Sequence, residues 1–146
     1  MTVERRSTTT QAADAGAPAS TSTYGRQLCG ILLAAFTLSA AHTVYAWLEG
    51  IEDPDFTVTT PLAWAFYAVG FGSAWLALRS SRIAQAALLA YLTVLLCIAT
   101  LYYPTTFGPA QQTAFGWVEN DLYVGLLVAA TWLSVLRLRR VGLRPD

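Results

Sequence analysis

A histidine, a tyrosine and a glutamate follow one another at helical spacing within an otherwise apolar stretch. His42 is followed by Tyr45 and Glu49, and on a helix turning about 100° per residue these side chains fall within an arc of about 60°. They would form one polar stripe. In one interpretation the histidine hydrogen-bonds a backbone carbonyl or a threonine, and the glutamate lies among lipid headgroups. In the other, these residues take part in chemistry. Both interpretations stay open, because either one avoids the cost of an unpaired polar group in lipid.

A second polar cluster, Glu119-Asn120-Asp121, lies between Trp117 and Tyr123. Acidic residues stabilise the first turn of a helix through the exposed N–H groups and the helix dipole, but one acid is enough for that purpose. Glu119 and Asp121 point about 200° apart on a helix. We therefore expect at least one of the two carboxyl groups to face the interior of the protein.

These acids and the aromatic residues around them suggest a specific chemistry. A carboxylic acid in apolar surroundings keeps its proton to higher pH and can act as a general acid near neutrality. Aromatic faces attract cations. Such a site suits protonation of an alkene or epoxide in a lipophilic substrate, with the rings stabilising the carbocation. The catalytic candidates are Glu119, Asp121 and Glu49, and the substrate-binding candidates are His42, Tyr45, Trp47, Trp64, Tyr67, Trp117, Asn120 and Tyr123. Gln111 and Gln112 could close the site from above.

Long uncharged runs must position these residues. The chain has 146 residues, of which 55% are hydrophobic and 12% charged, whereas a soluble domain carries about 25% charged residues. A membrane-spanning helix needs roughly 20 mostly apolar residues, and helices satisfy their own backbone groups in lipid. The sequence therefore predicts an all-α, four-helix transmembrane bundle, with spans at about 28–48, 61–78, 83–102 and 118–136.

The arginines predict how the bundle is oriented. Positive residues stay on the cytoplasmic side, and the arginines lie before the first span, between the second and third, and after the fourth: Arg5, Arg6, Arg26, Arg79, Arg82, Arg137, Arg139, Arg140 and Arg144. We expect both termini in the cytoplasm and the protein in the plasma membrane. Residues 1–25 read as a disordered tail, and 141–146 as a short C-terminal tail. The sequence has no metal-ligand motif and predicts neither a cofactor nor a nucleic-acid partner.

Over residues 26–140 the chain resembles the small bacterial membrane-bound terpene cyclases of indole-terpenoid and related natural-product pathways. Those are short multi-span proteins that start cyclisation with acidic residues. The likeness lies in the architecture and in Glu49, Glu119, Asp121 and the surrounding aromatic residues. The chain has no DxDD motif, and its residues 52–55 differ from the acidic motif of membrane lycopene cyclases. The resemblance implies a cofactor-free cyclase or isomerase that acts on an isoprenoid.

Two other functions remain open. In the first, the chain is a non-catalytic membrane subunit that binds a partner, or a second copy of itself, through the small-residue face formed by Ala68, Gly70, Gly72 and Ala74. Small residues at such spacing let helices approach closely. In the second, it is a transporter component. We rank transport last, because the cytoplasmic halves of the spans offer few polar residues beyond Gln85.

Overall fold

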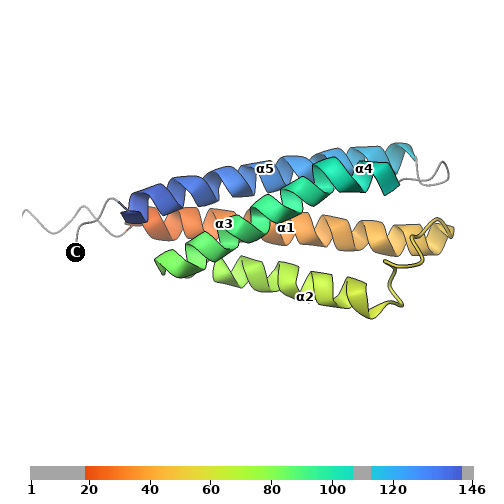
Figure 1. The fold of residues 1–146 in the computed structure, drawn as a ribbon, viewed down its shortest axis with the longest axis horizontal. Coiled ribbons are helices and arrows are strands. Elements are labelled where there is room, and N and C mark those ends of the chain that lie inside the picture. Colours follow the sequence, from red (N-terminus) through yellow and green to blue (C-terminus); the bar gives the residue numbers. More distant parts are fainter. Residues whose placement is uncertain (1–18, 107–112, 143–146) are drawn as a thin grey trace, which may run out of the picture.

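The computed structural model describes residues 19–106 and 113–142, and this part of the chain is helical with no regular β-strand. The helices are α1 (Ala19–Glu49), α2 (Pro61–Leu76), α3 (Arg82–Cys97), α4 (Tyr103–Thr106) and α5 (Ala114–Gly142), and the π-helical turn η1 (Ile98–Tyr102) joins α3 to α4. Since α3, η1 and α4 are continuous, the described chain forms four antiparallel rods (Figure 1). The all-helical fold is therefore confirmed.

Three stretches of helix are long and apolar enough to cross a membrane. They are Thr23–Glu49, Arg82–Thr105 and Ala114–Arg140, and they contain the spans expected at 28–48, 83–102 and 118–136. Helix α2 occupies the position of the remaining expected span. It has only 16 residues, a length of about 24 Å, which is less than the roughly 30 Å of a bilayer's hydrocarbon core.

The four rods have one acidic end and one arginine end. The described acidic residues lie where α1 ends and α5 begins: Glu49, Glu52, Asp53, Asp55, Glu119 and Asp121. We call this the acidic end, and the opposite end, which carries Arg79, Arg82 and Arg137, the arginine end. Helix α1 packs along α2 and α5, and α5 packs along α3. Helix α3 starts beside α2 at the arginine end and crosses obliquely to finish beside α5 (Figure 1), so α2 and α3 touch little.

The core follows the three- and four-residue spacing of apolar side chains on the facing helices. Its fully buried large side chains are Leu28, Leu32 and Phe36 of α1, Leu88 and Leu92 of α3, and Leu127 of α5. Of the small-residue face expected on α2, one half is buried and the other half is exposed. Gly70 and Ala74 are buried, with the Phe36 ring lying directly against Gly70. Ala68 and Gly72 are exposed, so one half of this face packs within the molecule.

The connection between α3 and α5 is shorter than the sequence suggested. A loop was expected over 103–117, but α4 and the start of α5 are helical at its two ends. Proline lacks an N–H and its ring clashes with the carbonyl four residues earlier. The π turn directly precedes Pro104, where the Tyr103 N–H bonds Ile98 O. This wider turn lets the rod continue through the proline. Gln111 and Gln112 lie outside the described residues.

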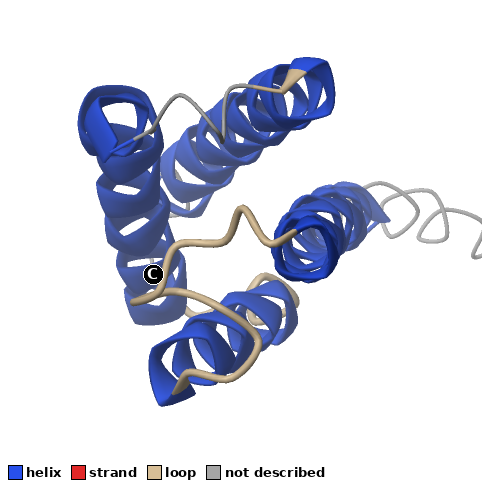
Figure 2. Ribbon diagram, turned by 90° about the vertical axis from the view of Figure 1, so that its right-hand side faces the viewer, coloured by secondary structure: helices blue, strands red, loops and turns tan. Residues whose placement is uncertain are grey.

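Helix α1 begins at Ala19, so residues 19–25 of the expected tail are helical, while 1–18 and 143–146 lie outside the described residues. At its other end α1 stops in a Schellman motif. Gly50 has a φ of +67°, and the N–H groups of Gly50 and Ile51 donate to Trp47 O and Ala46 O at 3.3 and 3.0 Å. The chain then turns back across the acidic end of the bundle before α2 (Figure 2).

Candidate functional site

The centre of the candidate site is a carboxyl group that faces a histidine across the interface of α1 and α5. Glu119 lies on the buried face of α5, where 7% of its surface is exposed, and its Oε2 is 3.2 Å from Nδ1 of His42. The angle of approach does not meet hydrogen-bond geometry, so Nδ1 has no hydrogen-bond partner among the described residues. Glu119 is the one buried acid in the part of the chain that the structure describes.

Two aromatic rings hold the histidine in place. Phe115, one turn before Glu119 on α5, stacks on the His42 imidazole with ring centroids 6.2 Å apart and planes 7° apart. Tyr45 of α1 packs against Phe115 at 4.6 Å and against His42 at 6.3 Å. The imidazole therefore lies beside two aromatic rings, one from each helix, that pack on each other, and this packing restricts its orientation.

Tyrosines from three helices lie near the carboxyl group. Tyr67 of α2, Tyr103 of α4 and Tyr123 of α5 each lie within electrostatic range of Glu119. The Tyr67 hydroxyl donates to Ser39 O at 3.0 Å and shares a hydrogen bond with Thr43 Oγ1 at 2.6 Å. These bonds join α2 to α1 beside the site, so the Tyr67 ring has a defined position.

The loop between α1 and α2 adds to the site at the acidic end. Phe56 packs edge-on against Phe66, with ring centroids 5.4 Å apart, and in a tilted arrangement against Tyr67 at 6.1 Å. Asp53 accepts a hydrogen bond from the Asp55 N–H at 2.8 Å and lies within electrostatic range of Tyr103. The loop is therefore attached to the same cluster of aromatic residues and lies across the end of the bundle (Figure 2).

The structure brings together some of the residues that the sequence singled out and not others. His42, Tyr45, Tyr67, Glu119 and Tyr123 lie around one centre, as described above, and Asn120 is buried beside Glu119 on α5. The remaining candidates have exposed side chains: Glu49, Asp121, Trp47, Trp64 and Trp117. Asp121 lies on the opposite face of α5 from Glu119, as their 200° separation requires. The three tryptophan side chains point away from the protein interior. Tryptophan is common at the membrane–water interface of membrane proteins.

The sequence reasoning missed several residues of the site. Phe115 stands four residues before Glu119. Because α5 begins at Ala114, both residues lie on the same face of this helix. Ser39 and Thr43 are also four residues apart, a spacing that could have identified the polar face of α1 toward α2. Tyr103 had been assigned to a loop and gave no such signal, because its position depends on the π turn.

The arrangement can hold a proton on a buried carboxyl group, transfer it over a short distance, and surround a cation with aromatic rings. Among the described residues no group of three His, Cys, Asp or Glu side chains could bind a metal ion. No protein family, curated protein or solved structure matches the chain.

Proposed function

We propose that the chain is a multi-pass membrane protein that cyclises or isomerises a lipophilic isoprenoid, with Glu119 as the acid that starts the reaction. The observation that supports this most directly is the buried Glu119 carboxyl group, 3.2 Å from His42 and within electrostatic range of three tyrosines. The same chemistry follows from the resemblance to small membrane-bound terpene cyclases.

In the proposed reaction, the Glu119 carboxyl group gives its proton to one carbon of a substrate double bond. The π electron pair forms the new C–H bond and leaves a carbocation on the neighbouring carbon. A second double bond of the substrate attacks this cation and closes a ring, or, in an isomerisation, no ring forms. Loss of a different proton to the Glu119 carboxylate or to His42 regenerates a double bond. The product is an isomer of the substrate, so no further reactant is needed.

The neighbours of Glu119 have separate roles in this reaction. His42 is a positioning residue for the carboxyl group and an acceptor for the proton that is lost. The rings of Phe115, Tyr67 and Tyr123 lie near the carboxyl group, and an aromatic face attracts a cation by about 0.5–2 kcal/mol. Exclusion of water is equally important, because water would quench the carbocation. The aromatic loop residue Phe56, packed on Tyr67, contributes to this barrier.

We further propose that α2 crosses the membrane with the other three rods, and that both termini are cytoplasmic because the arginines favour that side. Helix α2 is short, but the residues at its ends reach the interfaces. Arg79 extends its guanidinium over the Trp75 ring at 4.0 Å, and the Trp64 indole N–H donates to Val58 O at 3.0 Å. Anchoring by such side chains is how a short helix spans a bilayer.

Product analysis tests the enzyme proposal. The protein in nanodiscs is incubated with a panel of prenylated and epoxidised-prenyl substrates, and products are identified by mass spectrometry and NMR. We expect a cyclised or isomerised product from the wild type, a loss of at least about 100-fold in Glu119→Gln, as for removal of a general acid, and a smaller loss in His42→Gln.

The matched control is Asp121→Asn, two residues from Glu119 but on the exposed face of α5, which should keep full turnover. Equal turnover in Glu119→Gln and the wild type would exclude Glu119 as the acid. If folded wild-type protein gave no product with any substrate, the non-catalytic subunit would be the better interpretation.

A further inference from the structure

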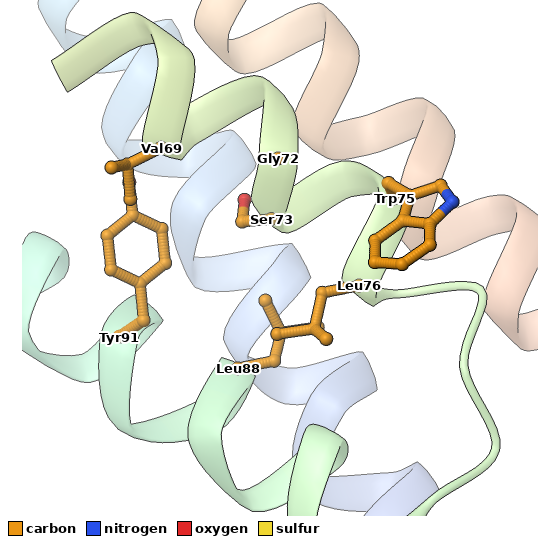
Figure 3. Close-up of a pocket in the computed structure, with 7 residues that line it drawn as sticks. All are labelled: Val69, Gly72, Ser73, Trp75, Leu76, Leu88 and Tyr91. Carbon is orange, nitrogen blue, oxygen red and sulfur yellow. The ribbon is translucent and has the colours of Figure 1, made fainter. Parts of the chain in front are cut away.

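An apolar groove lies between α2 and α3, away from Glu119. It has a volume of about 460 Å³ and is lined by Val69, Gly72, Ser73, Trp75, Leu76, Leu88 and Tyr91 (Figure 3). This volume is within the roughly 300–1,000 Å³ range of small-molecule sites. Two features create the groove. Helices α2 and α3 diverge from the arginine end, and Gly72 has no side chain to fill the space. A Cβ atom built on Gly72 meets nothing within 4 Å.

The groove is open to the surroundings of the bundle and offers almost no polar group. Val69 and Trp75, at its edge, are 56% and 58% exposed. The Ser73 hydroxyl donates to Gly70 O at 2.6 Å and is not available to a ligand. With α2 in the bilayer as proposed above, the medium around the groove is hydrocarbon, and an apolar surface of this shape is complementary to a lipid chain. The Tyr91 hydroxyl is buried and has no hydrogen-bond partner among the described residues.

Positive charge is held at the arginine end of the groove. The Arg79 guanidinium lies 4.0 Å above the ring of Trp75, which itself lines the groove. The backbone that carries this arginine is fixed from two sides. Its carbonyl accepts hydrogen bonds from Gln85 Nε2 at 2.5 Å and from Arg137 Nη2 at 3.4 Å. Arg79 is therefore positioned by its own ring contact and by buried side chains of α3 and α5.

No described acid neutralises this charge. The described aspartates and glutamates lie at the acidic end, and the one ion pair among the described side chains joins His42 to Glu119 at that end. Basic residues between transmembrane helices at headgroup level bind anionic lipid headgroups. The groove and the arginine end together match a molecule with an apolar chain and an anionic head.

We propose that this groove binds one acyl chain of an anionic phospholipid whose phosphate pairs with Arg79. The lipid fills the space between α2 and α3, which touch little, and joins the two helices. The site does not use Glu119 or His42, so this inference is independent of the catalytic proposal and can be tested without a substrate.

Native mass spectrometry of the full chain tests the proposal. The protein is released from micelles containing equal amounts of phosphatidylglycerol and phosphatidylcholine with identical acyl chains, and bound lipid is counted. An arginine near a headgroup contributes about 1 kcal/mol of attraction, so we expect about a fivefold preference for phosphatidylglycerol. Equal retention of the two lipids by the wild type, or no retained lipid, would overturn the proposal.

Two variants distinguish the contribution of the lipid's acyl chain from that of its headgroup. Gly72→Leu fills the groove and should remove most of the bound lipid of either kind. Arg79→Gln keeps the groove and the backbone carbonyl contacts, so it should retain lipid while its preference falls to about one. The matched control is Gly125→Leu on α5, an exposed glycine whose Cβ also meets nothing within 4 Å. Lipid retention by Gly72→Leu equal to that of this control would contradict the inference.

Discussion

Replacing Gly70 by alanine places a methyl group where the Phe36 ring already lies. The three atoms nearest to a Cβ built at this position all belong to that ring, each closer than real Cβ contacts allow. Phe36 is fully buried and packs against Phe66 and Phe71 at 5.8 and 6.2 Å, so it has little freedom to move away. Overpacking of this kind costs about 1–3 kcal/mol.

Alanine is also a better helix former than glycine by about 0.5–1 kcal/mol, which offsets part of that cost. We therefore expect Gly70→Ala to lower the free energy of unfolding by about 1 kcal/mol. Gly72→Ala, two residues away and unobstructed, should change it by less than about 1 kcal/mol and in the stabilising direction.

The assay is equilibrium unfolding in mixed micelles, followed by circular dichroism. In the double variant Gly70→Ala/Phe36→Leu, a smaller side chain faces the new methyl group. The double variant should therefore lose less stability than the sum of the losses in the two single variants. If Gly70→Ala were as stable as Gly72→Ala, the packing of α2 against α1 described above would be wrong.

The same assay checks three further changes. Arg137→Met should cost about 1–3 kcal/mol, because the buried guanidinium donates to the Ala77 carbonyl at the end of α2; an unchanged value would refute this anchoring role. Tyr67→Phe should cost about 1 kcal/mol by removing the bonds to Ser39 O and Thr43 Oγ1 while keeping the ring; an unchanged value would show that the hydroxyl does not join α2 to α1. Gly50→Ala should cost about 1 kcal/mol, since Gly50 has a φ of +67°; no loss would mean that α1 does not end in a left-handed residue.

The apolar runs were sufficient to predict the helices, because a stretch such as 83–102 has no other stable form in lipid. Their ends were less predictable. The third expected span ends at 102, but a π turn carries the rod through Pro104 to Thr106, and a wider turn has no signature in the sequence. The start of α1 at Ala19 was also missed, because its first residues are polar and small.

Within the site, helical geometry alone separated Glu119 from Asp121, since two groups 200° apart cannot face the same neighbour. Geometry could not say which of the two would be buried. That depends on how α5 is rotated against α1, which is set by core residues such as Leu127. The contact between His42 and Glu119 joins residues far apart in the chain and required the packed structure. Trp47 could not be placed by spacing alone either, because an aromatic residue near a site can equally face a membrane interface.

The central claim is that Glu119 supplies the proton that starts the reaction, and an isotope measurement tests it most directly. An isoprenoid alkene that the wild type converts is incubated in deuterated water, where the Glu119 carboxyl group exchanges its proton for deuterium. We predict a product carrying one deuterium on the carbon that is protonated, and no such product from Glu119→Gln. A product without carbon-bound deuterium, or one labelled equally by Glu119→Gln, would contradict the account.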